Sequence, residues 1–295
     1  MSAKPLAADP AAPDDAPRLV EVDWGGRSVA IEHAWIGSAR RDAPLFVFLH
    51  EGLGSLAMWK DFPRALCDAL GVRGLVYSRP GYGASTPRPP DERWDVDFMH
   101  RQAHEVLPAF LAAVGVGPSA PAPWLFGHSD GGSIALLYAA RFPGRVAGLA
   151  VLAPHVFVED VGLASIDAAR QTFLTGNLRD RLARYHRDVD SAFWGWNDIW
   201  LHPPFRRWNI EEEIAAIRVP VLAVQGRDDE YGTLAQVEGV AKAVPGTRVV
   251  VLDDCGHSPH KDQPARLVEE VARFHANPGA AGTGSSPHQA RQEEP

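Results

Sequence analysis

Short apolar runs of strand length alternate with longer amphipathic stretches along most of this chain, and this alternation restricts its fold more than any other feature. The run PLFVFLH at 44–50 is apolar on both faces, as is typical of a strand that is buried on both sides of a sheet. Strands are expected at 27–37, 44–50, 74–78, 122–128, 146–154, 219–226 and 247–254, and helices at about 60–70, 96–115, 130–142, 233–244 and 261–276. Such alternation predicts an α/β fold with a mostly parallel sheet and helices on both of its faces.

One long segment interrupts the alternation. Residues 156–208 hold no strand-like run, but they hold helical patterns and the aromatic stretch FWGWNDIWLHPPFRRW at 193–208. Ligands of open α/β sheets bind outside the carboxyl ends of the strands, where a long insertion would cover them. We therefore predict an inserted helical cap at 156–208, between two parts of one core at 18–155 and 209–276.

Composition and charge exclude other classes of protein. The 295 residues carry 29 Lys and Arg against 37 Asp and Glu, a net charge of −8, whereas a nucleic-acid surface needs clustered basic residues. No apolar stretch reaches the roughly 18 residues of a membrane span, and Cys67 and Cys255 form no CxxC pair. We expect a soluble cytoplasmic protein that acts on a small molecule, with a homodimer left open. Residues 1–17 and 277–295 are expected to be disordered tails.

The sharpest functional signal is GHSDG at residues 127–131. It follows the buried run WLF and precedes the apolar helix pattern GSIALLYAARF. A GxSxG sequence at a strand-to-helix turn is typical of a nucleophile elbow, because the turn is so tight that its flanking residues must be small. The turn would expose the hydroxyl of Ser129 above the sheet. Ser129 is therefore the candidate nucleophile.

A serine nucleophile needs a base within hydrogen-bond reach and an acid that orients the base. His257 stands in DDCGHSPHKDQP, on a loop after the last predicted strand, and it is the candidate base. Asp228 and Asp229 both stand in the loop after the preceding strand. Asp229 is favoured because the acid usually stands three residues beyond the glycine that ends the strand, here Gly226. The candidate nucleophile, acid and base follow one another in this order along the chain, which is the order expected of a hydrolase with a nucleophile elbow.

These motifs together resemble the α/β-hydrolase superfamily over essentially all of residues 18–276. The supporting sequences are the elbow at Ser129, HEGLGS at 50–55, SRPGYGAST at 78–86, GRDDE at 226–230 and CGHSPH at 255–260. The resemblance implies a serine hydrolase that needs neither a cofactor nor a metal.

The resemblance also implies an oxyanion hole made of two backbone amides. One would be the N–H of Asp130, the residue after the nucleophile. The other would come from HEGLGS, which departs from the usual pattern in having Glu51 where a glycine normally stands. The donor is then Gly52 or Leu53, and Gly52 is favoured; the role of Glu51 is left open.

Two further patterns have competing interpretations. The string GxSDGG is similar to that of valacyclovir-hydrolase-like enzymes, in which the acid holds a substrate amine, but an Asp in the first turn of a helix is also stabilised by the helix dipole alone. The dipole interpretation is favoured for Asp130. His100 and His104 are four residues apart on a predicted helix, yet Arg101 replaces the Glu of a zinc motif, so surface histidines are favoured and no metal is predicted.

The substrate pocket is expected beneath the cap. Its candidate residues are Leu53 in HEGLGS, which we call the oxyanion loop, His155 at the start of the cap, and Trp194, Trp196 and Trp200 in the aromatic stretch. Aromatic residues of this kind also make buried contacts between helices, so packing is the alternative role of the three tryptophans.

The sequence thus predicts a serine hydrolase that cleaves small or medium carboxylic esters with an apolar or aromatic portion, through an acyl-enzyme at Ser129. A C–C bond hydrolase of ring-cleavage diketones and a cofactor-free haloperoxidase or perhydrolase are alternatives with the same catalytic residues. A ligand-binding module without turnover is the alternative from another class, because fold alone does not choose among these functions.

Overall fold

A computed structural model describes residues 15–279 of the chain. Its eight strands form one sheet in the order β1-β2-β4-β3-β5-β6-β7-β8. The strands are β1 (Arg18–Trp24), β2 (Arg27–Gly37), β3 (Leu45–Leu49), β4 (Arg73–Tyr77), β5 (Trp124–His128), β6 (Gly148–Leu152), β7 (Val221–Gly226) and β8 (Arg248–Leu252). The β1/β2 and β2/β4 pairs are antiparallel. The pairs β4/β3, β3/β5, β5/β6, β6/β7 and β7/β8 are parallel. The predicted α/β fold class is confirmed.

Helices cover both faces of this sheet, as the two-sided apolar runs predicted. In β3, Phe46 and Phe48 pack with α1 (Phe62–Leu70) and α11 (Pro264–Ala276) on one face, whereas Val47 and Leu49 pack into the cluster on the opposite face. The opposite face is covered by α2 (Phe98–Arg101), the π-helical segment η2 (Gln102–Val106), α3 (Leu107–Ala113), α4 (Asp130–Arg141), α8 (Glu211–Ile214) and α9 (Ala235–Ala243). Successive side chains of a strand point to opposite faces, so a buried parallel strand must be apolar throughout.

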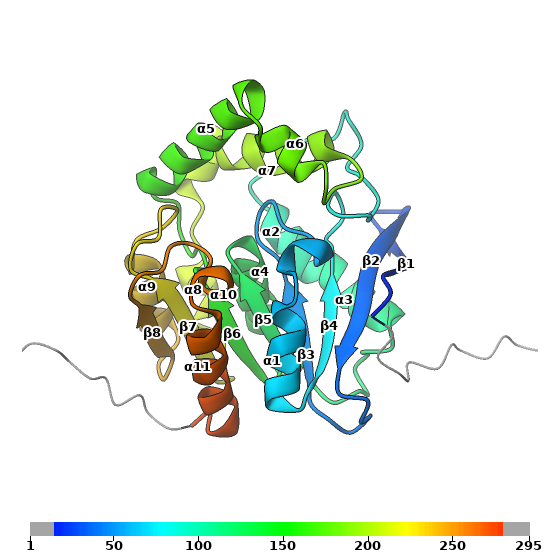
Figure 1. The fold of residues 1–295 in the computed structure, drawn as a ribbon, viewed down its shortest axis with the longest axis vertical. Helices are drawn as coiled ribbons and strands as arrows, with labels where there is room; N and C mark the ends of the chain where they lie inside the picture. Colours follow the sequence, from blue (N-terminus) through cyan, green and yellow to red (C-terminus); the bar gives the residue numbers. More distant parts are fainter. Residues whose placement is uncertain (1–14, 280–295) are drawn as a thin grey trace, which may run out of the picture.

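A third group of helices lies across the edge of the sheet where the parallel strands end (Figure 1). We call α5, α6, α7 and η3 the cap helices. Their bounds are α5 (Asp160–Thr175), α6 (Leu178–Leu182), α7 (Val189–Trp200) and the 3₁₀ turn η3 (Pro203–Arg207). Aromatic rings fill the space between them: Phe173 of α5 stacks on Phe193 of α7 with ring centroids 3.7 Å apart.

The N-terminal strand β1 was not predicted. It pairs with β2 at the edge of the sheet, and four of its seven residues, Arg18, Leu19, Glu21 and Asp23, are exposed. Residues 1–14 and 280–295 of the predicted tails lie outside the described residues. No helix within 15–279 has both the length and the apolar character needed to span a membrane.

Candidate active site

The turn between β5 and α4 holds Ser129 in a strained backbone conformation. Its φ of 54° and ψ of −121° lie in a region that residues with a side chain rarely adopt. Two glycines make the turn sterically feasible: a Cβ atom on Gly127 would lie 2.3 Å from the carbonyl oxygen of Gly131, and one on Gly131 would lie 2.1 Å from that of Leu49. The small residues of GHSDG are therefore required by close backbone approach, as the sequence predicted for an elbow.

The three side chains predicted from the loops meet at this turn. His257 Nε2 lies 2.9 Å from Ser129 Oγ, and His257 Nδ1 lies 2.8 Å from Asp229 Oδ1. Asp228, the alternative acid, is exposed and its side chain takes no part in these contacts. A neutral imidazole that donates to the acid from Nδ1 keeps Nε2 free to accept the serine proton. The arrangement can therefore generate a nucleophilic alkoxide at Ser129 Oγ.

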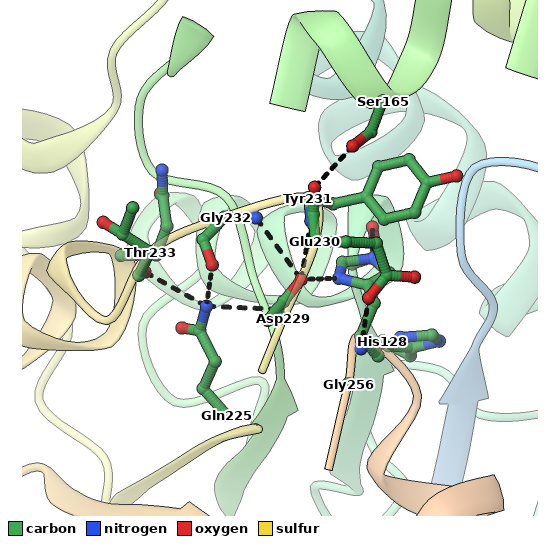
Figure 2. Close-up of polar contacts among 12 residues, drawn as sticks. His128, Ser165, Gln225, Asp229, Glu230, Tyr231, Gly232, Thr233 and Gly256 are labelled. Atoms are coloured by element: carbon green, nitrogen blue, oxygen red, sulfur yellow. Dashed lines mark hydrogen bonds and ion pairs between the residues drawn. The ribbon is translucent and has the colours of Figure 1, made fainter. Parts of the chain in front are cut away.

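Asp229 also accepts hydrogen bonds from its own loop and from the preceding strand β7 (Figure 2). Its Oδ1 also accepts from the N–H groups of Tyr231 at 2.8 Å and Gly232 at 3.3 Å, and its Oδ2 accepts from Gln225 Nε2 at 3.1 Å. Burial alone would raise the pKa of Asp229, but the hydrogen bond and the electrostatic interaction with His257, together with the Tyr231 N–H, hold that pKa below its ordinary value. The carboxylate therefore stays ionised at neutral pH, as the orienting acid must.

Three backbone N–H groups near Ser129 have no hydrogen-bond partner within the described residues. They belong to Gly52, Leu53 and Asp130, the candidate oxyanion donors. The Glu51 carbonyl that precedes Gly52 accepts from His50 Nδ1 at 2.7 Å, Arg79 Nη2 at 2.9 Å and Gly54 N at 3.0 Å. Because the C=O and N–H groups of one trans peptide point in opposite directions, these three donors turn the next N–H away from Arg79. The contacts leave the choice between residues 52 and 53 open.

The carboxylate of Asp130 is enclosed rather than open to a ligand. Its side chain is 1% exposed, with Oδ2 at 3.6 Å from Arg79 Nη2 and Oδ1 accepting from Trp200 Nε1 at 3.2 Å. Burial raises the pKa of Asp130, and Arg79 opposes this increase. Arg79 already offsets the charge of this acid and Trp200 already donates to it, although Oδ2 itself has no hydrogen-bond partner within the described residues. These contacts do not favour a role in binding a substrate amine.

The comparisons with known proteins agree with this geometry. The model of the alpha/beta hydrolase family matches residues 46–270. The chain belongs to this family. A curated relative, the pimeloyl-[acyl-carrier protein] methyl ester esterase of Aromatoleum aromaticum, is 26% identical over 265 residues, which make up 78% of this chain and 98% of that protein. The predictions of an α/β-hydrolase and of an enzyme are confirmed.

Solved structures show the same fold at low sequence identity. A thermophilic esterase from Thermogutta terrifontis aligns with a TM-score of 0.68 at 18% identity and covers 90% of this chain and 100% of its own. A membrane phospholipase A described as a bacterial virulence factor also aligns with a TM-score of 0.68, at 22% identity, and covers 88% of this chain and 86% of its own.

The predicted pocket residues of this alpha/beta hydrolase lie in different places. The His155 ring lies 5.7 Å from that of His257 and 4.9 Å from that of Trp200, measured between centroids, and burial lowers the pKa of His155 to about 3. Trp196 lies against Gly52 of the oxyanion loop, and Leu53 belongs to the same loop. These residues surround the candidate site.

Trp194 differs from these residues, and its prediction as a pocket residue is not supported by its contacts. It lies on the other side of α7, where its ring packs against those of Phe173 and Phe193 with centroids 5.5 and 5.0 Å away. Arg170 of α5 stacks over it at 5.6 Å. Trp194 therefore serves the alternative role, packing between the cap helices.

The predicted surface histidines also have partners. His100 Nε2 and His104 Nε2 lie 2.9 and 3.5 Å from the carboxylate of Glu213 on α8. Both histidines are partly buried at this contact between helices. Within residues 15–279, His, Cys, Asp and Glu side chains form no group of three or more that could hold a metal ion.

Sequence reasoning missed several residues that support the base. His128 Nε2 donates to the main-chain carbonyl of His257 at 2.7 Å, and Glu230 Oε2 accepts from the His257 N–H at 3.1 Å. Glu51, whose role was left open, lies 3.7 Å from His128 Nδ1. Burial alone would raise the pKa of Glu51, but His128 and Lys261 hold it well below its ordinary value. Of these residues, only Glu51 was noticeable in the sequence, because it stands where the loop normally has a glycine.

Proposed function

We propose that this alpha/beta hydrolase cleaves small or medium carboxylic esters with an uncharged apolar or aromatic acyl portion. The observation that carries the proposal is the unbroken hydrogen-bonded chain from Ser129 through His257 to Asp229, next to backbone amides without partners. Trp196 and Trp200 of the cap supply apolar surface. Because Asp130 is already paired with Arg79, the site offers no free carboxylate to a cationic substrate at this position.

In the proposed mechanism, Ser129 Oγ attacks the ester carbonyl carbon while His257 Nε2 takes the hydroxyl proton. The carbonyl oxygen becomes an oxyanion and accepts hydrogen bonds from the N–H groups of Gly52 and Asp130. Collapse of the tetrahedral intermediate breaks the bond to the alcohol, which leaves with the proton from His257. Water then attacks the acyl-enzyme with His257 as base, and the carboxylic acid leaves while the proton returns to Ser129.

The first test is a substrate panel with wild type and Ser129→Ala. We expect hydrolysis of p-nitrophenyl esters, little turnover of aryl diketones and of amino-acid esters, and covalent labelling of wild type by a fluorophosphonate. Ser129→Ala is expected to lose the label and about 10⁴-fold or more of kcat. Unlabelled wild-type protein, or full activity of Ser129→Ala, would contradict the proposal. Preference for diketones or for amino-acid esters would indicate one of the alternative substrates.

The acid assignment has a matched pair of neighbours for its own test. Asp229→Asn is expected to lower kcat by about 10⁴-fold, because the amide NH₂ group can donate to His257 Nδ1 and so favours the wrong imidazole tautomer. Asp228→Asn changes an exposed side chain and is expected to keep wild-type kcat. The reverse result would assign the acid to residue 228. Both variants are measured with p-nitrophenyl butyrate at one pH and checked by thermal unfolding.

A further inference from the structure

The cap touches the oxyanion loop, HEGLGS at 50–55, at two neighbouring residues. His186 Nε2 donates to the carbonyl of Leu53 at 2.9 Å, and Trp196 lies against Gly52. A Cβ atom built on Gly52 would lie 2.2 Å from Trp196 Nε1 and 2.4 Å from Trp196 Cδ1, so the indole occupies the space where a side chain would begin. The backbone of Gly52 is not in the left-handed region that only glycine favours. The glycine is therefore needed here because of the approach of Trp196, and the indole nitrogen lies against the loop that carries a candidate oxyanion donor.

The indole N–H of Trp196 has no hydrogen-bond partner within residues 15–279, unlike those of two other tryptophans. Trp24 Nε1 donates to Glu105 at 2.7 Å, and Trp200 Nε1 donates to Asp130 at 3.2 Å. The unpartnered indole nitrogens of Trp59 and Trp208 are fully buried, whereas the indole nitrogen of Trp196 keeps some access to solvent. The Trp196 side chain as a whole is buried, and the N–H groups of buried tryptophans usually find a hydrogen-bond partner. The partner of Trp196 can therefore be a molecule that enters the site.

Helix α7 brings its two inner tryptophans to opposite sides of the candidate oxyanion hole. Trp196 and Trp200 are four residues apart and so lie on the same face of the helix. Trp200 is fixed to Asp130, whose N–H is one candidate donor, while Trp196 lies against Gly52, which carries the other. The free indole N–H is thus held beside the site where the acyl oxygen would bind.

We propose that Trp196 is a hydrogen-bond donor from the cap to the acyl oxygen of the substrate, a third donor beside the amides of Gly52 and Asp130. The inference rests on the proposed ester hydrolysis by Ser129. It gives the cap a part in the reaction itself, because the donor reaches the oxyanion only when α7 lies against the loop. A donor aimed at developing charge stabilises the transition state more than the bound ester.

The first experiment removes the N–H and keeps an aromatic ring. Trp196→Phe is expected to lower kcat for p-nitrophenyl butyrate by about 10- to 100-fold, with KM within about twofold of wild type, a loss of the size found for one oxyanion donor or somewhat less. Trp194→Phe, on the packing side of the same helix, is the matched control and is expected to keep wild-type kcat. Unchanged kcat in Trp196→Phe, or a change in KM alone, would overturn the inference.

The second experiment uses the contact with Gly52. Gly52→Ala is expected to lower kcat by about tenfold or more because the new methyl group displaces the indole. In a Trp196→Ala background the methyl group has room, so adding Gly52→Ala should cost less than about threefold. Equal losses in both backgrounds would mean that the contact does not matter.

Two controls separate this inference from the proposed function and from misfolding. Fluorophosphonate titration counts the competent sites of each variant, and thermal unfolding reports its stability. If Ser129→Ala retains activity, the proposed function itself fails. If Ser129→Ala is inactive while Trp196→Phe matches wild type per titrated site, only the third donor is refuted.

Discussion

A single buried cation connects the two sides of the candidate oxyanion hole. Arg79 is fully buried, donates to the carbonyl of Glu51 and lies 3.6 Å from the carboxylate of Asp130. Its guanidinium also stacks over the ring of Tyr82 at 4.7 Å. It therefore fixes the peptide that carries the Gly52 amide, and it offsets the charge of Asp130, whose N–H is the other candidate donor. Removing one member of a buried ion pair is costly, because the other charge is left without a partner.

Arg79→Met is therefore expected to lower the free energy of unfolding by about 3 kcal/mol or more. The double variant Arg79→Met/Asp130→Asn should be more stable than Arg79→Met alone, since it leaves no buried carboxylate unpaired. Arg40→Met, which breaks the exposed pair with Asp42, is the matched control and should not change stability measurably. Urea unfolding at pH 7 measures all three. A loss in Arg79→Met no larger than in Arg40→Met would contradict the expected role of the pair.

At this scale the sequence predicted the side chains that follow strands and missed those that join distant loops. Ser129, Asp229 and His257 each stand just beyond a parallel strand, so the sheet brings them to one edge. The contact between Arg79 and Asp130 has no such local signal, because it depends on how the loops after β4 and β5 pack. Nor could the sequence show which side of α7 faces the site, since tryptophans lie on both sides.

Among the elements, two cap helices contact different catalytic loops. Helix α7 lies against the oxyanion loop through Trp196, whereas α5 lies against the loop that holds Asp229. Ser165 Oγ of α5 donates to the Glu230 carbonyl at 2.5 Å, as Figure 2 shows. A Cβ atom on Gly162 of α5 would lie 2.5 Å from the Tyr231 carbonyl oxygen. The position of the cap is thus coupled to the loops that hold the candidate acid and a candidate oxyanion donor.

Gly162→Ala distinguishes this contact from ordinary helix propensity. In an open helix, Ala would stabilise by about 1 kcal/mol relative to Gly. At position 162 we expect the steric conflict with the Tyr231 carbonyl to prevail, so that the melting temperature does not rise and kcat/KM falls several-fold. Ala168→Gly, at an exposed position of the same helix, measures the propensity alone and should cost about 1 kcal/mol. A more stable Gly162→Ala protein with wild-type activity would refute the contact.

The elements that were predicted well have a regular burial pattern, which is alternation along much of β2 and burial of nearly every residue in α4. The strand expected at 27–37 is β2 with the same bounds, and the helix expected at 130–142 is α4, which ends at Arg141. The helix expected at 96–115 is instead three consecutive pieces with a π-helical middle, η2. Apolar periodicity averages over turns of 3.6 residues, so one locally wider turn does not change it visibly.

Over the whole molecule, buried histidines link stability to pH. His50, His155 and His260 are 0%, 6% and 4% exposed. Burial lowers the pKa of His50 well below its ordinary value, that of His155 to about 3 and that of His260 to about 2. In the unfolded chain each would take up a proton near pH 6.5. Below that pH the unfolded state binds more protons than the folded state, so acid favours unfolding.

We therefore expect the free energy of unfolding to fall between pH 7 and pH 5, by about 2 kcal/mol each for His155 and His260 and further through His50. Burial also lowers the pKa values of His33, His128 and His186, which add to the fall in the same direction. Asp229 and Glu51, whose pKa values are lowered, lose their contributions only at more acidic pH. Asp130, whose pKa is raised, acts in the opposite sense and offsets part of the fall.

The prediction is checked by urea unfolding at pH 7, 6 and 5 with two matched variants. His260→Phe preserves the ring contacts with Trp59 and Phe62 and should reduce the fall by about 2 kcal/mol, because one fewer proton is taken up on unfolding. His202→Gln changes an exposed histidine and should keep the wild-type dependence. If stability were constant from pH 7 to pH 5, or if His260→Phe and His202→Gln had the same slope, the buried neutral histidines would not be the source of acid sensitivity.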